Sequence, residues 1–171
     1  MKLLLPAPLA ERLIAALRRA GRREIGGILM GEHVGENLFR IVECTVQARG
    51  GTTSRFVRQD EPSDEALTEF AEKHGHDHHR FNYLGEWHSH PCHPLIPSRM
   101  DIETMTDIVE APDTGANFAV LLLVRLDCAG RLAAAAQAHL PGSHIWEVAV
   151  VIERALQEDA ARSAGRPHDD Q

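Results

Sequence analysis

Hydrophobic residues along the chain follow two spacings, one typical of helices and one typical of strands. The helical spacing first occurs at Leu9, Leu13, Ile14 and Leu17. It predicts an amphipathic helix from Pro8 to Ala20, and Gly21 is a suitable stop. Further helices are predicted after Pro62, with apolar positions up to Ala71, and from Ser98 to Glu110, with Ser98 as N-cap.

Short apolar runs between turn residues predict strands. The predicted strands cover residues 2–5, 24–34, 37–48, 81–90, 117–126 and 131–140, with a further short strand at 55–58. Residues 144–157 fit a strand, a helix or one followed by the other, and we expect a helix from Glu153 to Arg162. Three prolines between residues 91 and 98 exclude regular structure there.

Strands and helices are interspersed, and neither a repeat nor a linker divides them. The pattern predicts a single α/β domain over residues 1–163, in which helices flank a mixed sheet. Residues 164–171 are polar and are expected to form a disordered tail. A chain of 171 residues with 43% hydrophobic residues can build one substantial core.

Charge and cysteine content exclude several classes of protein. The formal net charge of −7 and the lack of long basic runs argue against a nucleic-acid partner. The leucines near the N-terminus are interrupted by Pro6 and Pro8, so neither a secretory signal nor a membrane span is expected. Three widely spaced cysteines argue against a disulfide framework. We therefore expect a cytoplasmic protein with reduced thiols.

Histidine is unusually frequent, with 11 residues, and most lie between His74 and His93. The cluster at residues 74–79 is best interpreted as a solvated polar loop, with adventitious metal binding as the alternative. His88 and His90 differ, because side chains two apart on a strand project from one face, about 7 Å apart along the backbone. Two imidazoles on one face can converge on a single ion.

Asp101 is the predicted third ligand. Seven residues separate His90 from Ser98, and two more separate Ser98 from Asp101. The loop can turn the first turn of the next helix back towards the end of the strand. Two histidines and one carboxylate leave the fourth zinc position open to water, as a catalytic site requires. Taken alone, however, Ser98 and Asp101 also fit a capping box, which is purely structural.

The motif resembles that of a known family. Metallo-β-lactamases also carry His-x-His, but they need Asp and His directly after it, where this chain has Cys92 and His93. In contrast, His-Ser-His-Pro with the following Ser98 and Asp101 resembles the JAMM motif of the JAB/MPN metallopeptidases at every defining position. The sequence Glu-Ile-Gly-Gly-Ile-Leu-Met-Gly, starting at Glu24, resembles the family's upstream Glu-x-x-Gly-x-Leu-x-Gly pattern.

This resemblance, over about residues 9–140, implies a curved central sheet flanked by helices and one Zn²⁺ per chain. It implies that His88, His90 and Asp101 hold the metal and that Glu24 is the general base. Ser98 would donate a hydrogen bond to the oxyanion. Glu86 is the rival base, since it shares the face of the two histidines, although a supporting carboxylate is the favoured interpretation.

Other residues beside the motif have simpler interpretations. Trp87 should point to the opposite face and pack in the core. Cys92 and His93 could form a nucleophile pair, but adjacent residues in a proline-rich loop are poorly placed for the hydrogen bond it needs.

The resemblance also implies a substrate class. The form of the motif is most similar to a bacterial branch encoded beside ubiquitin-like conjugation enzymes in antiphage operons. The expected activity is cleavage after the C-terminus of a ubiquitin-like protein, whose tail would add to a sheet edge. Activating and conjugating enzymes are then possible partners. The alternatives are a zinc amide hydrolase acting on small-molecule or sulfur-carrier conjugates, and a non-catalytic scaffold.

Overall fold

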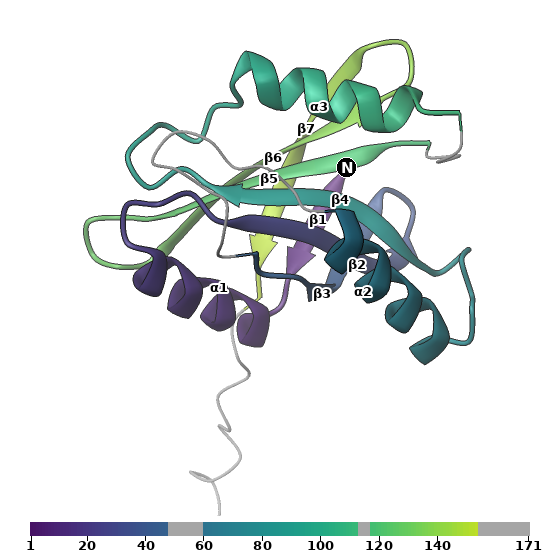
Figure 1. The fold of residues 1–171 in the computed structure, drawn as a ribbon, viewed down its shortest axis with the longest axis horizontal. Coiled ribbons are helices and arrows are strands. Elements are labelled where there is room, and N and C mark those ends of the chain that lie inside the picture. Colours follow the sequence, from purple (N-terminus) through teal and green to yellow (C-terminus); the bar gives the residue numbers. More distant parts are fainter. Residues whose placement is uncertain (48–59, 113–116, 154–171) are drawn as a thin grey trace, which may run out of the picture.

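The computed structural model describes residues 1–47, 60–112 and 117–153 (Figure 1). The elements in chain order are β1 (Lys2–Leu5), α1 (Ala7–Ala20), β2 (Gly26–Gly35), β3 (Leu38–Cys44), α2 (Asp60–Lys73), β4 (Phe81–Ser89), α3 (Arg99–Glu110), β5 (Ala119–Leu126), β6 (Leu132–Leu140) and β7 (His144–Ile152). These agree with the predicted elements, and the ambiguous segment after residue 143 begins as a strand. The predictions for residues 55–58, 154–162 and 164–171 lie outside the described residues.

The sheet is mixed, as predicted, but it closes into a barrel in the order β1-β3-β2-β4-β5-β6-β7. The prediction of an α/β domain with a mixed sheet is confirmed, but the expected curved sheet is a closed barrel, because β1 links β3 to β7. This four-residue strand lies between β3 and β7 and pairs in parallel with both. Each of the seven described strands therefore has two neighbours, but β1 pairs only with residues 38–40 of β3 and residues 149–152 of β7. The addition of a substrate tail to a sheet edge stays a prediction.

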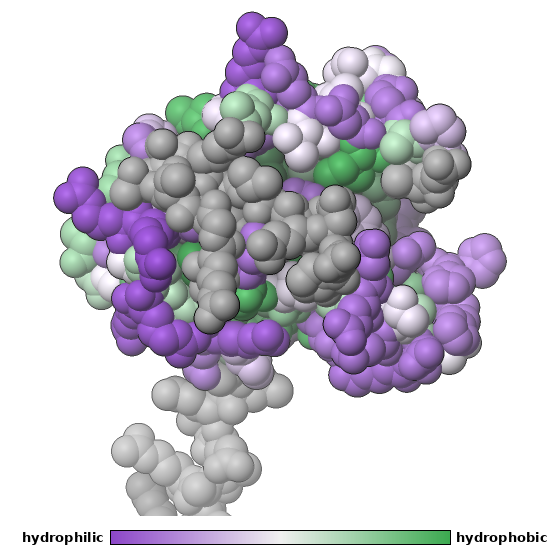
Figure 2. Space-filling view, viewed as in Figure 1, coloured by the Kyte–Doolittle hydropathy of each residue, from purple (hydrophilic) through white to green (hydrophobic). Residues whose placement is uncertain are grey.

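The main core fills the inside of the barrel. Its buried members come from all seven strands and from the apolar face of α1, and they include Leu3, Leu13, Leu29, Ile41, Leu84, Trp87, Leu122, Ala138 and Val148. The opposite face of α1 carries exposed arginines. Hydrophilic side chains accordingly cover the outward faces of α1 and α2 along the lower edge of the space-filling view (Figure 2).

Two smaller clusters lie on the outside of the barrel. Met105 and Val109 of α3 pack on β5, and Phe70 of α2 packs on Ile28 and Met30 of β2. Figure 1 shows α3 and α2 on separate parts of the sheet. Strand β4 lies between β2 and β5. Its outer face is therefore bordered by both clusters.

A β-bulge in β4 decides which of its side chains face outwards. The pairing with β2 shifts register at this point: Met30 lies opposite Tyr83, whereas Leu29 lies opposite Gly85. Leu84 and Trp87, three residues apart, both reach the inner core. The alternation of faces therefore changes by one residue, and without the bulge His88 would point into the barrel.

Gly85 permits this bulge in two ways. Its φ of 143° is one that residues with a side chain rarely adopt. A Cβ at this position would also collide with the backbone of Val120 on β5. The close approach of β4 and β5 thus depends on glycine immediately before the segment that carries the two histidines.

No helix within the described ranges is long and apolar enough to cross a membrane. Cys44 is buried, Cys92 and Cys128 are exposed, and all three are free thiols.

Candidate metal centre

The start of β2 and the end of β4 form the base of the candidate site. Gly26 lies opposite His88, and the backbone of Ser89 donates to the carbonyl of Ile25 at 2.8 Å. Continuing this antiparallel register places Glu24 opposite His90. Because side chains alternate along each strand, Glu24, His88 and His90 share the outer face. Gly26 contributes no side chain to the position across from His88.

His88, His90 and Asp101 converge at one point. One ligand atom from each lies within 4.8 Å of the others. The two Nε2 atoms of the histidines are 3.1 Å apart, and the Asp101 carboxylate oxygens lie 3.5 Å from Nε2 of His88 and 3.9 Å from Nε2 of His90. Both histidines are buried, and Asp101 is half-buried. Within the described ranges, no other group of three histidine, cysteine or acidic side chains has this spacing.

A hydrogen bond fixes His90 in the tautomer that can bind a metal through Nε2. Nδ1 of His90 lies 2.8 Å from the carbonyl oxygen of Pro94, so this nitrogen carries the proton and donates. Nε2 then carries no proton, and its lone pair faces His88 and Asp101. A second ring nitrogen held by a carbonyl is the usual arrangement of a metal-ligating histidine, so the donor set fits a zinc ion.

Asp101 is held in place by the start of α3. Its Oδ2 accepts a hydrogen bond from the backbone of Ser98 at 2.6 Å, and the Ser98 hydroxyl accepts one from the backbone of Asp101 at 3.2 Å. The capping box and the metal geometry are therefore both present, and one carboxylate serves both. The Ser98 oxygen acts as an acceptor in the cap, and its hydroxyl also hydrogen-bonds the Asp101 carboxylate.

The electrostatics of Asp101 favour its ionised form. Burial alone would raise the pKa of this carboxyl, but the hydrogen bond and charge of His88, together with the bonds to Ser98, lower the pKa to about 2. Asp101 is thus a carboxylate at neutral pH, as a ligand must be.

Glu24 is buried beside this group. Burial raises the pKa of its carboxyl, and the nearby charges of His88 and His90 act in the opposite direction. Carboxyls with a raised pKa near a candidate metal site have the property expected of a general base. Glu24 was found by motif alone, and the register of β2 and β4 gives the physical reason for its position.

Ser89, the serine between the two histidines of the motif, is a positioning residue. Its hydroxyl is fully buried and accepts a hydrogen bond from the backbone of Ile25 at 3.0 Å. This bond joins the residue after Glu24 to the residue between the two histidines. A serine between two ligands on a strand was the available signal, since a buried hydroxyl needs a partner.

The residues around the two histidines are divided between the core, the outer face and the loop. Trp87 is fully buried in the inner core, and its Nε1 donates to the carbonyl of Thr45. Glu86 is buried on the outer face, as expected from its spacing to His88. Cys92 is exposed in the loop after the strand, and His93 has its ring 6.4 Å from that of His90.

The histidines at 74–79 form a turn outside the candidate site. His74 stacks on Phe81 at 4.0 Å between ring centroids, and His76 has a positive φ of 56°. Neither belongs to the metal-competent group. This part of the cluster shapes the connection from α2 to β4.

The fold and this donor set define a class, an α/β domain with a metal-competent His-His-Asp group, and comparison with known proteins identifies the family. The model for prokaryotic homologs of the JAB domain matches residues 6–146, so the chain belongs to that family. Protein DSY2949 from Desulfitobacterium hafniense, known from a solution structure, has a similar fold with a TM-score of 0.59. The two sequences are 18% identical, and the match covers 92% of this chain and 97% of that chain. No curated protein matches this chain.

Proposed function

We propose that this protein is a zinc-dependent amide hydrolase of the JAMM type, with one Zn²⁺ per chain held by His88, His90 and Asp101. The observation that carries the proposal is the convergence of these three side chains beside a buried glutamate, Glu24. A purely structural metal site would not require a buried carboxyl beside it, whereas a catalytic site uses such a group, here Glu24 with its raised pKa, as a base.

Bound zinc would supply a Lewis acid that polarises the scissile carbonyl and brings the pKa of a water molecule near neutrality. Glu24 takes the proton of the attacking water and passes it to the leaving amine. Ser98 would turn its hydroxyl proton from the Asp101 carboxylate to the oxyanion of the tetrahedral intermediate, while its oxygen continues to cap α3. His90 is held in orientation by Pro94 and Asp101 by the backbone of Ser98.

The proposed substrate is the C-terminal tail of a ubiquitin-like protein, joined to a lysine or to a further peptide. Membership of the JAB family supports amide hydrolysis, and the form of the motif supports the bacterial branch linked to ubiquitin-like conjugation in antiphage operons. Activating and conjugating enzymes of such an operon are the proposed partners.

The test is cleavage of a ubiquitin-like protein fused through its C-terminus to a reporter, with zinc-loaded protein and with chelator-treated protein. We expect cleavage after the tail that is lost with chelator and restored by zinc. Cleavage of small acyl-amides but not of fusions would favour the alternative hydrolase. Stoichiometric zinc without cleavage of either substrate would favour a non-catalytic scaffold and contradict the proposal.

A further inference from the structure

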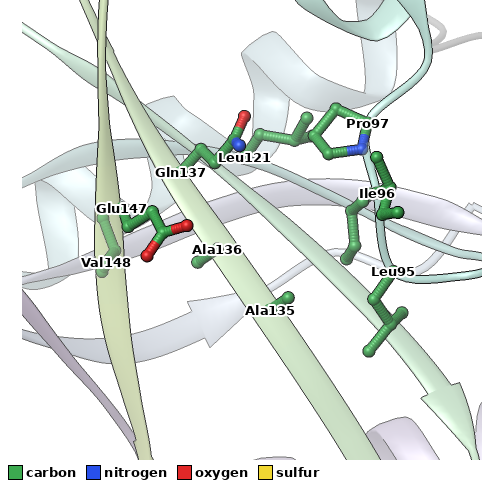
Figure 3. A pocket seen from close by; sticks show the side chains of 10 residues that line it. Leu95, Ile96, Pro97, Leu121, Ala135, Ala136, Gln137, Glu147 and Val148 are labelled. Carbon is green, nitrogen blue, oxygen red and sulfur yellow. The ribbon is translucent and has the colours of Figure 1, made fainter.

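A pocket of about 400 Å³ lies beside the candidate metal centre on the outer face of the barrel. Leu95, Ile96 and Pro97 form one wall, and they belong to the loop that joins His90 to Ser98. Leu121 and Leu123 of β5 also line the pocket, and the side chain of Leu121 lies beside Pro97 (Figure 3). The wall of this pocket is therefore continuous with the loop that positions the ligands.

The register of the sheet gives the distance from the pocket to the site. Leu123 lies directly opposite His88, and Leu121 lies opposite Glu86. Neighbouring strands are about 4.8 Å apart, so the pocket begins one strand away from a ligand and extends over about 10 Å. An extended substrate chain covers this range in about one to three residues.

The pocket contains two side-chain groups that can accept hydrogen bonds. Gln137 of β6 lies opposite Glu147 of β7, and both face the pocket (Figure 3). The Gln137 side-chain oxygen is buried and has no hydrogen-bond partner. Glu147 is exposed. None of the described residues that line the pocket is a lysine, an arginine or a histidine.

We propose that this pocket binds an arginine or lysine side chain of the substrate, one to three residues from the scissile amide. The leucines and Ile96 contact the aliphatic part of that side chain, and Gln137 and Glu147 accept hydrogen bonds from its charged end. A purely apolar side chain would leave the buried Gln137 oxygen unpaired, and an acidic one would meet Glu147. The inference rests on the proposed hydrolase function, whose substrate preference it specifies.

The first test is a binding titration, which needs no turnover. The probes are acetyl-Gly-Arg-Gly-amide and the same peptide with citrulline or norleucine in place of arginine, added to the ¹⁵N-labelled full chain loaded with zinc. We expect saturable shifts of the Gln137 side-chain amide and of the Leu121 backbone amide with the arginine peptide. Binding should be about tenfold weaker with the two neutral peptides.

Variants show whether the charge of Glu147 is responsible. Glu147→Gln should weaken binding of the arginine peptide about tenfold and leave that of the citrulline peptide unchanged. Glu36→Gln is the matched control, because it removes the same charge from the turn at the far end of β2 and should have no effect. Equal binding of the three peptides, or no saturable shift, would overturn the proposal.

Failure of the pocket and failure of the hydrolase function can be told apart. Selective binding of the arginine peptide supports the pocket even where no fusion is cleaved. Conversely, a fusion could be cleaved efficiently with a kcat/KM that changes neither with Arg→Gln substitutions near the scissile bond nor with Glu147→Gln in the enzyme. That result would refute the pocket and leave the hydrolase function standing.

Discussion

Glu24 and Glu86 are two buried carboxyls on the same face as the histidines, and they have different expected roles. Glu24 interacts electrostatically with His88, His90 and Asp101. Glu86 is opposite Leu121 and Ile28 and is bordered by apolar clusters. Only the first is placed to exchange protons with a water at the candidate site.

We therefore predict that Glu24→Gln lowers kcat by about 10²–10⁴-fold while the zinc content stays the same. The amide preserves the shape of the side chain but cannot accept the proton. Steady-state kinetics with a fusion substrate, together with metal analysis of the same sample, measure both quantities. Glu86→Gln is the comparison variant, and full activity in Glu24→Gln with loss in Glu86→Gln would reverse the assignment.

His139 gives a prediction about stability and pH. Its ring is almost fully buried, both ring nitrogens lack a hydrogen-bond partner, and burial lowers the pKa of the imidazole below its usual 6.5. Between these two pKa values the unfolded chain binds more protons than the folded one. The free energy of unfolding must therefore fall as the pH drops below about 6.5.

Replacing His139 by leucine removes this titration. Between pH 7.5 and 5.5 the variant should lose less stability than the parent protein, with a difference approaching about 1.4 kcal/mol per pH unit at most. Urea unfolding at the two pH values, measured on metal-free protein, gives the comparison. Parallel losses in the two proteins would show that His139 does not titrate as described.

At the scale of elements, the bulge in β4 links the fold to the candidate site. Gly85 has a backbone conformation and a contact with Val120 that exclude a side chain. Everything after it on the strand depends on the resulting change of face.

Gly85→Ala should therefore destabilise the protein by about 2 kcal/mol or more, from backbone strain together with the collision. Zinc affinity should fall as well, because the histidines are displaced. Thermal unfolding and a zinc titration test this. Gly35→Ala is the control, since a Cβ there meets nothing within 4 Å and φ is unexceptional, so both measurements should change little.

The sequence predicted the elements near the site well because their signals are local. Spacing by two places His88 and His90 on one face, and Ser98 is the kind of residue that starts a helix. The bulge was not predictable in this way. If the faces of the strand alternate regularly from Tyr83, His88 falls on the inner face. No feature of the nearby sequence shows that Leu84 and Gly85 together lie opposite the single residue Leu29.

At the scale of the whole molecule, long-range pairing was the least predictable feature. Residues 2–5 were recognised as a strand, but their pairing with β3 and β7 depends on contacts across almost the entire described chain. The position of Glu24 is similar: a motif indicated it, and only the antiparallel register explains it. In both cases the physical cause is tertiary and lies outside any short window of sequence.

The candidate ligands come from β4 and α3, so the proposed metal connects two elements separated by a proline-containing loop. Zinc at 100 times its Kd should raise the free energy of unfolding by about 2.7 kcal/mol. Thermal unfolding with and without zinc measures the shift, and His90→Ala should abolish it. A zinc-induced stabilisation that survives this substitution would place the metal elsewhere.

The most direct measurement is the zinc content of the purified full chain after loading and dialysis. Elemental analysis should give one zinc per chain for the parent protein and Glu24→Gln, and close to none for His88→Ala, His90→Ala and Asp101→Ala. A parent protein that retains no zinc, or ligand variants that retain as much as the parent, would contradict the account.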